Sequence, residues 1–379
     1  MRALVLLAIL DLHGAISLRG VNATGPESWL DGGWGRLPAG GNEDALLADA
    51  HLGADLDLGK YFDLHVSGTA DNDRAGVVEA YVAARAEFGL DELQLRAGQF
   101  FLPTSRENKD ALWQSPYTVN FSALNSWIGE EVRPIGADLQ YRHVTARGHA
   151  ITAAATAFRG NDTMGTLLAW RGWSSGNRLA THGETLPLRP EILTHFPAPN
   201  RGTQPFGKDL DGRTGWSGRV RYSLPERANV QWTYVDNRGD RALYGGEYSW
   251  ATRFHHFGAE IGNPDRLVVA AEYLRGATGM GLRHGAFVDA GFYATYVLVS
   301  HKRGRNRWSA RYETFNTTER DFSIAENNAE QGRAWTFAWL FDLFEHTRIA
   351  AEFTQFVGDR AGTPDPDARN VSLEARYRF

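Results

Sequence analysis

The sequence contains no cysteine, three methionines and only four lysines among its 379 residues. Without cysteine, disulfide scaffolds, thiolate zinc sites and cysteine nucleophiles are excluded. No apolar run approaches the roughly 20 residues that a membrane-spanning helix needs, which excludes a helical membrane protein. The formal net charge is −5, and this mildly acidic balance argues against nucleic acid as the main partner, because phosphate binding needs a basic surface.

Glycine and aromatic residues are abundant instead. The chain has 41 glycines, and aromatic residues make up 12% of it, including 12 tryptophans. This aromatic content argues against disorder. The composition indicates a β protein with one large domain, or two by length alone.

The dominant pattern along the chain is alternation of apolar and polar residues. It is clearest at the C-terminus, where one face carries Val371, Leu373, Ala375, Tyr377 and Phe379, and the other carries Ser372, Glu374, Arg376 and Arg378. Because side chains of a strand point to opposite faces with a period of two, such segments predict strands with one apolar and one charged face.

Many of these strands run to 10–14 residues, and very short turns alternate with much longer connections. Sixteen strands are predicted, at 11–22, 46–58, 60–70, 77–89, 91–101, 135–146, 148–159, 214–224, 226–237, 247–260, 264–275, 285–300, 304–316, 332–344, 346–358 and 370–379. Residues 164–173 also read as a strand, but counting them would reverse the side of every later loop, so they are placed in a loop. Residues 151–158 and 287–299 fit the alternation poorly.

Aromatic placement favours a membrane environment over a soluble core. Trp335, Phe337, Trp339 and Phe341 share one face of a single strand, and lipid accepts such a face without any covering sheet. The alternative is a large β-sandwich or propeller. We therefore predict an all-β fold, a transmembrane antiparallel up-and-down β-barrel of about 16 strands, with short periplasmic turns and long extracellular loops.

Two segments resemble a known family. The chain ends in Ala-Arg-Tyr-Arg-Phe379, which looks like the insertion signal of Gram-negative outer-membrane proteins. Arg96-Ala-Gly-Gln-Phe-Phe-Leu-Pro-Thr-Ser105 resembles a segment of the phosphate-selective porin O and P family, and this resemblance implies a trimeric 16-stranded barrel. The chain departs from that family in its scarcity of lysine, so phosphate selectivity is not carried over.

The N-terminus has two interpretations. Residues 1–10 contain a short apolar stretch with only fragments of an export signal, so they are either a remnant of a signal segment or simply an apolar strand. Residues 11–379 are predicted to form a single outer-membrane barrel domain.

The phase of the strands predicts which charges face the lumen. The predicted pore-lining residues are Arg85, Arg96, Asp138, Arg142, Arg219, Arg221, Arg311, Glu313, Glu374 and Arg376. Because the signs nearly balance, weak ion selectivity is expected unless the charges segregate across the bore. The alternative is that each arginine pairs with a carboxylate on a neighbouring strand and stiffens the wall.

A bore of sixteen strands stays filled with water unless loops fold into it. Residues 102–133 are the predicted constriction loop, with Arg106, Glu107, Lys109, Asp110, Trp113, Tyr117, Glu130 and Glu131 as its site residues. Aromatic residues on this loop could stack on sugar rings or could pack it against the wall. Residues 160–213 form a second long extracellular loop that caps or partly fills the mouth.

The predicted function is a porin, a passive diffusion channel for small hydrophilic solutes or ions in the outer membrane of a Gram-negative bacterium. The first alternative is a substrate-specific channel or exporter for sugars, oligosaccharides or anions. The second is a soluble β-rich carbohydrate-binding protein or enzyme. No catalytic motif, cofactor or metal site is predicted. The expected partners are the lipid bilayer, small solutes and, by resemblance, two further copies in a homotrimer, with no nucleic acid.

Overall fold

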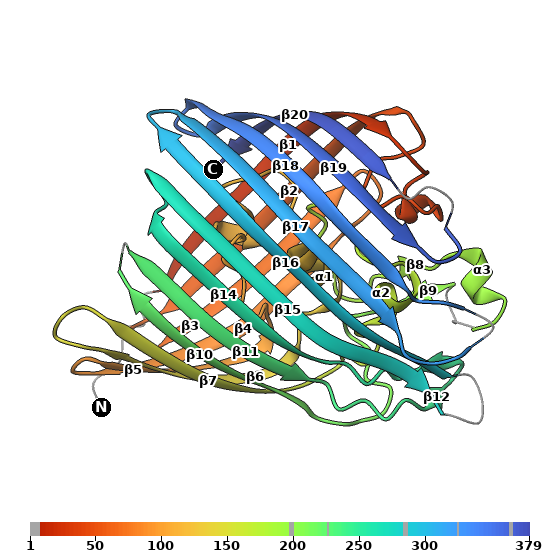
Figure 1. Ribbon diagram of the computed structural model, residues 1–379. Coiled ribbons are helices and arrows are strands. Elements are labelled where there is room, and N and C mark those ends of the chain that lie inside the picture. Colours follow the sequence, from red (N-terminus) through yellow and green to blue (C-terminus); the bar gives the residue numbers. More distant parts are fainter. Residues whose placement is uncertain (1–7, 197–200, 226, 283–286, 324–325, 364–366) are drawn as a thin grey trace.

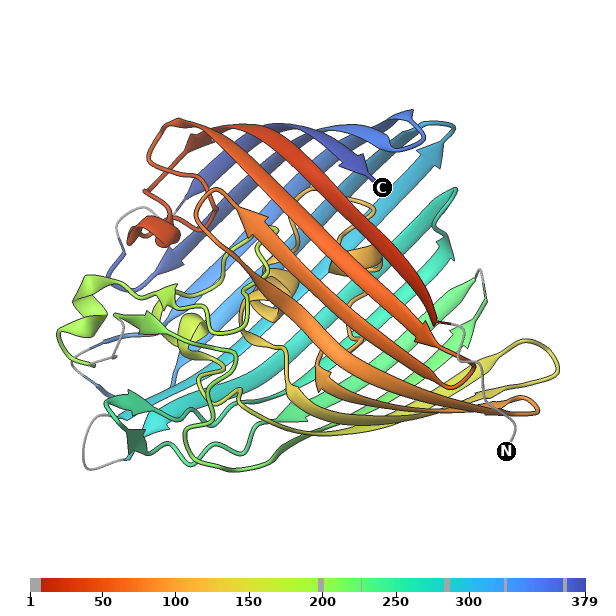
Figure 2. The same cartoon turned by 180° about the vertical axis from the view of Figure 1, so that it is seen from behind.

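A computed structural model describes residues 8–196, 201–225, 227–282, 287–323, 326–363 and 367–379, and its sheet closes on itself (Figures 1 and 2). Sixteen strands form one closed antiparallel barrel in which each strand pairs with its neighbours in the chain order of the barrel strands. The predicted fold class and strand number are therefore confirmed. The barrel strands are β1 (Ala8–Thr24), β2 (Asp44–Leu58), β3 (Phe62–Asp71), β4 (Ala75–Phe88), β5 (Asp91–Gln99), β6 (Ile135–Val144), β7 (Ala150–Arg159), β10 (Gly215–Leu224), β11 (Ala228–Asp236), β14 (Arg253–Asn263), β15 (Leu267–Gly281), β16 (Phe287–Arg303), β17 (Asn306–Glu319), β18 (Glu330–Phe344), β19 (Thr347–Arg360) and β20 (Ala368–Arg378).

The barrel closes between its first and last strands. β1 pairs with β20 from Ala15 opposite Arg378 to Thr24 opposite Arg369. The Gly14 N–H donates to the Phe379 carbonyl at 3.0 Å, and the Phe379 N–H donates back to the Gly14 carbonyl at 3.1 Å. A side chain at position 14 would meet the Phe379 ring at 2.6 Å, so glycine lets the terminal aromatic ring lie against β1.

The start of β1 differs from the predicted boundary. Residues 1–7 lie outside the described residues, but Ala8, Ile9 and Leu10 pair with Leu58, Asp57 and Leu56 of β2. The predicted signal segment 1–10 therefore overlaps β1 by three residues.

Strand phase sorts the side chains as the alternation predicts. On β20, Leu373 is 63% exposed on the outer surface, whereas Glu374 beside it is 2% exposed inside. Phe337 and Trp339 of β18 also lie on the outer surface, while Ala338 between them is buried. The outside of the barrel thus presents apolar side chains, as lipid requires.

The strand at β16, which fits the alternation poorly in the sequence, has a regular phase in the structure. Phe292, Tyr296 and Leu298 point inward and are buried, while Tyr293 and Val297 point outward. Both faces are apolar because the inner face packs against a loop rather than against water. The sequence of this strand therefore lacks the alternation of polar and apolar residues that marks the other strands.

Shorter elements lie within the long connections. They are η1 (Trp29–Asp31), η2 (Ala111–Trp113), α1 (Ala123–Glu131), α2 (Thr166–Trp170), β8 (Leu186–Pro187), α3 (Pro190–Leu193), β9 (Gly202–Thr203), β12 (Leu243–Tyr244) and β13 (Glu247–Tyr248). Residues 164–173, which also read as a strand, contain helix α2 and lie in the loop, as predicted. Within the described residues, no helix has the length and hydrophobicity needed to span a bilayer.

Long and short connections lie at opposite ends of the barrel. The tight turns after β2 and β16 contain Gly59 and Gly304, which have the positive φ angles of 76° and 59° that glycine adopts most readily. α3, β8 and β9 lie at the other end, whereas α1 lies inside the barrel in both views (Figures 1 and 2). We call these the short-turn end and the long-loop end.

Candidate channel interior

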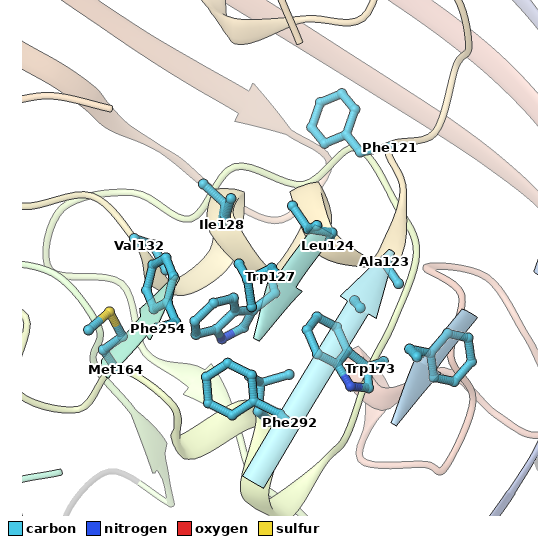
Figure 3. Packing of buried hydrophobic residues seen from close by; sticks show 14 of the residues in the cluster. Phe121, Ala123, Leu124, Trp127, Ile128, Val132, Met164, Trp173, Phe254 and Phe292 are labelled. Atoms are coloured by element: carbon cyan, nitrogen blue, oxygen red, sulfur yellow. The ribbon is translucent and has the colours of Figure 1, made fainter. Parts of the chain in front are cut away.

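Residues 102–133 fold into the barrel and fill part of its bore. The side chain of Ser122 caps α1 by accepting a hydrogen bond from the Asn125 N–H, and all nine residues of α1 are buried. Trp127 packs edge-on against Phe254 of β14 and Phe292 of β16, with ring centroids 5.3 and 5.4 Å away (Figure 3). The apolar part of the inner face of β14–β16, which includes Phe254, Leu274 and Phe292, is therefore the surface on which α1 rests.

Three glutamates of the barrel wall hold this loop by its backbone. Glu352 accepts the N–H groups of Val119 and Asn120 at 2.6 and 3.0 Å. Glu313 accepts the Ala123 N–H at 2.6 Å, and Glu272 accepts the N–H groups of Arg106 and Glu107. Hydrogen bonds to an ionised carboxylate are roughly twice as strong as neutral ones. The wall thus fixes the path of the loop at three points.

One buried ion pair joins the loop to β17. Arg311 donates to Glu107 of the loop and, at 3.2 Å, to Glu313 of its own strand. It also donates to the Phe121 carbonyl at 3.0 Å, and neither Arg311 nor Glu107 is accessible to solvent. Because the guanidinium is fully bonded, this arginine acts as an internal brace.

A second loop, residues 160–213, packs on the first. Glu131 at the end of α1 accepts the Leu167 N–H at 3.0 Å, the Gly165 N–H at 3.1 Å and the Trp127 indole N–H at 2.7 Å. Burial raises the pKa of the Glu131 carboxyl to about 7, although these hydrogen bonds oppose the rise. This side chain joins the two loops and titrates near neutral pH.

A buried charge group anchors the second loop to the wall. Glu330 of β18 pairs with Arg36 at 2.9 Å and with Arg360 of β19 at 3.2 Å. Glu330 also accepts the Trp173 N–H at 3.1 Å, and Arg171 pairs with Glu130 at 2.7 Å. Burial lowers the pKa of Arg36 to about 10. Of this group, only Glu130 was singled out from the sequence, because the partners lie far apart in the chain.

The ten predicted pore-lining residues differ in how far protein covers them, and they form three groups. Arg85 and Arg142 are about half exposed, with side-chain exposures of 49% and 44%, and pair with Asp63 and Glu92. Arg96 and Arg221 are partly buried. The residues that face inward but are almost wholly covered by protein are Asp138, Arg219, Arg311, Glu313, Glu374 and Arg376.

All eight predicted residues of the constriction loop are buried or make contacts with other side chains. Six of them are buried or make close contacts with the wall or the second loop, namely Arg106, Glu107, Lys109, Tyr117, Glu130 and Glu131. Asp110 pairs with Arg378 at 3.0 Å, and Trp113 stacks on Phe101 with ring centroids 4.3 Å apart. The loop aromatics are therefore used in packing, which leaves Tyr117 no open ring face for a sugar.

Arginines gather on the β10 side of the bore with little compensating charge. Arg219 lies 3.6 Å from Asp138, which Arg96 also approaches at 3.4 Å. The charges acting on Arg221 come from Arg106 and Arg219. Among the described residues, the Nε atoms of Arg106 and Arg219 and the Nη1 atom of Arg219 have no hydrogen-bond partner. This group of arginines therefore carries excess positive charge.

Open space remains along the wall formed by β1–β3. A cavity of about 300 Å³ lies there, lined by Arg19, Asp49 and His51 of the wall and by residues of the connections, such as Arg74 and Arg178. Towards the short-turn end the wall becomes more exposed, as at Asp55 with 40% of its side chain accessible. This cavity is therefore lined by both acidic and basic groups.

Comparison with known proteins gives structural likeness only. No family model and no curated protein sequence matches the chain. The outer-membrane channel DcaP of Acinetobacter baumannii superposes with a TM-score of 0.60 at 12% identity, covering 98% of this chain and 97% of that one. OmpF of Salmonella typhi, solved with daunomycin, gives 0.58 at 11% identity over 98% and 97%.

This is the fold of outer-membrane porins. The anion-selective porin of Comamonas acidovorans shares it too, with a TM-score of 0.54, 12% identity and coverage of 98% of this chain and all of that one. A porin-like fold is thus established, whereas these comparisons do not assign the chain to the phosphate-selective porin O and P family.

Proposed function

We propose that this protein is a porin of the Gram-negative outer membrane, a passive diffusion channel for small hydrophilic solutes or ions. The observation that carries the proposal is a closed 16-strand barrel with an apolar outer surface and a charged interior narrowed by two inserted loops. In the outer membrane, the proposed orientation places the short turns on the periplasmic side and the long loops on the extracellular side.

The proposed path follows the β1–β3 wall. The inner loops are anchored mainly on β14–β19, and a cavity of about 300 Å³ remains beside the long-loop half of β1–β3. Most charged groups along the bore are paired with a neighbour of opposite sign, as Arg85 is with Asp63. Such pairing supports broad permeation with weak selectivity, and it requires neither an enzyme activity nor a cofactor.

Planar-bilayer recording of the purified protein tests this proposal. We expect discrete conductance steps that rise linearly with KCl concentration and fall when small polyethylene glycols enter the bore. Converting Arg142 to Glu should shift ion selectivity, since this side chain is half exposed. Arg333→Glu on the outer surface is the control. A protein that inserts in bilayers and yet gives no steps would contradict the proposal.

A second candidate is a channel that prefers anions. The arginines at 106, 219 and 221 support it, because Arg106 and Arg219 have N–H donors without a partner and the charges acting on Arg221 come from these two arginines. Guanidinium N–H donors suit carboxylates or phosphates. The zero-current potential across a KCl gradient should then indicate anion preference, and Arg221→Gln should reduce it. Arg333→Gln should not change it. Equal permeability of K⁺ and Cl⁻ in the unmodified protein would reject this candidate.

The lipid bilayer and two further copies of the chain complete the proposed set of partners. The exposed apolar side chains of the outer surface support contact with lipid, and the family resemblance supports the homotrimer. Chemical cross-linking in detergent, followed by electrophoresis without heating, should give a trimer band. A monomer at every cross-linker concentration would exclude the homotrimer and leave the channel proposal standing.

A further inference from the structure

Three adjacent strands place carboxylates and imidazoles side by side on the inner wall near the short-turn end. Asp11 of β1 lies directly opposite Asp55 of β2, and Asp55 lies directly opposite His65 of β3. His13 is two residues further along β1 and therefore points to the same face. Like charges directly opposite on neighbouring strands are destabilising, so Asp11 and Asp55 favour a cation between them.

The His13 imidazole faces both carboxylates without bonding to either. Its Nδ1 atom is 3.6 Å from an oxygen of Asp55 and 3.9 Å from an oxygen of Asp11, beyond hydrogen-bond range. The ligand atoms of all three side chains lie within 4.8 Å of one another. Opposite His13 stands Gly53, where a side chain would meet the imidazole at 2.4 Å. The absence of a side chain at Gly53 therefore leaves room for the His13 ring.

Asp55 is also oriented from its other side. Its second oxygen is 2.7 Å from Nδ1 of His65, so one oxygen is fixed by a hydrogen bond while the other faces His13. Outer partners of this kind fix the direction of metal-binding carboxylates and imidazoles. The side chains of His13 and His65 are 23% and 13% exposed, which leaves the group accessible from the bore.

The distances from the His13 nitrogen to the two carboxylates fit a metal ion bound by side chains of β1 and β2. Zinc binds imidazole nitrogen and carboxylate oxygen at about 2.0–2.2 Å, which places two tetrahedral ligand atoms about 3.4 Å apart. The separations of 3.6 and 3.9 Å exceed this by only a few tenths of an ångström. Imidazole favours zinc, copper and nickel, whereas magnesium and calcium prefer oxygen ligands alone.

We propose that His13, Asp11 and Asp55 form a binding site for a divalent transition-metal ion in the short-turn half of the bore, with His65 positioning Asp55. Water completes the coordination of the ion. The site lies beside the constriction loop, because the Leu112 side chain also borders the space above Gly53. Its existence does not depend on solute transport by the barrel.

Calorimetric titration of the full, tag-free protein in detergent with Zn²⁺ tests the site. We expect one Zn²⁺ per chain, and His13→Ala and Asp55→Asn should each weaken binding by about tenfold or more, since even outer partners contribute that much. His51→Gln is the matched control, because His51 is an inward imidazole of β2 that already pairs with Asp49 at 3.1 Å. Heat-modifiable migration in SDS shows that each variant is folded.

Two outcomes would overturn the proposal. One is Zn²⁺ affinity that stays unchanged in folded His13→Ala. The other is displacement of Zn²⁺ by an equal concentration of Mg²⁺, which would mean that the cations only screen the charges of the carboxylates. Cu²⁺ gives an independent measurement. Its electron paramagnetic resonance spectrum should show nitrogen coupling from His13, and this coupling should disappear in His13→Ala but persist in His51→Gln.

Discussion

At the scale of single residues, the interior depends on carboxylates that carry out different tasks. Glu272, Glu313 and Glu352 accept backbone N–H groups of the constriction loop, whereas Glu131 joins the two inner loops. An ionised carboxylate can accept several hydrogen bonds at once, which explains why Glu272 and Glu352 each hold two adjacent backbone N–H groups. Removing one acceptor leaves more than one buried donor unpaired.

The pKa of Glu131 predicts a pH-dependent stability. Because burial raises this pKa to about 7, above its unfolded value, the folded protein holds an extra proton between about pH 4.5 and 7. The contribution of Glu131 to stability is therefore present at low pH and lost as the pH rises through 7. Glu131→Gln should reduce the difference in thermal midpoint between pH 5 and pH 8. An undiminished difference would contradict this assignment.

The Arg311 ion pair predicts a large cost for removing one partner. Arg311→Met leaves Glu107 and Glu313 as buried, uncompensated charges, so the free energy of unfolding should fall by about 3–5 kcal/mol. Arg85→Met removes a half-exposed pair and should cost at most about 1 kcal/mol. Urea unfolding in vesicles measures both. Equal losses would mean that Arg311 is not an internal brace.

At the scale of elements, β16 and the helix α1 form a unit. Phe292 and Ala294 of β16 face inward and belong to the same buried cluster as Trp127. A strand that faces water on its inner side needs polar residues there, but one covered by a helix does not. The apolar inner face of this strand and the fixed position of the constriction loop therefore have the same cause.

Truncating this contact should destabilise the loop. Phe292→Ala removes a ring that is 3% exposed and packs on both Trp127 and Trp173, so we expect a loss of about 3–5 kcal/mol in unfolding free energy. Channel recordings should also become noisier, because the loop is less firmly held. Tyr293→Ala, on the lipid side of the same strand, is the control. If recordings from Phe292→Ala stayed quiet, channel noise would not depend on how firmly the loop is held.

At the scale of the whole molecule, the side chains of the outer surface differ between the middle of the barrel and its short-turn end. Exposed apolar residues such as Val220, Val297 and Leu373 occupy the middle of strands. Exposed aromatic side chains also occur in the middle of strands, as at Phe257 and Phe337, but one group of them lies near the short turns and includes Tyr61, Phe62, Phe88, Tyr141, Phe344, Tyr377 and Phe379. Aromatic girdles mark the interfaces of membrane barrels, so this end of the apolar band should lie at a bilayer surface.

A charge placed on the outer surface should therefore have a depth-dependent cost. Leu373→Lys in the middle of β20 should destabilise the inserted protein by about 2–4 kcal/mol, while Leu90→Lys at a short turn should cost about 0–1 kcal/mol. The two leucines are similarly exposed, at 63% and 55%, so the comparison isolates depth. Unfolding by urea in vesicles gives both values. Equal costs would contradict the proposed position of the membrane.

The alternation of residues such as Leu373 and Glu374 determined the barrel and its strand number, because a period of two is a local property of the backbone. The same local pattern placed Arg311 and Glu313 on the inner face. Only the tertiary structure showed that the loop covers them, because burial depends on segments distant in the chain, such as Glu107 and Arg311. The group of Asp11, His13 and Asp55 likewise required the strand register, since pairing between strands, and not the sequence of any one of them, brings its side chains together.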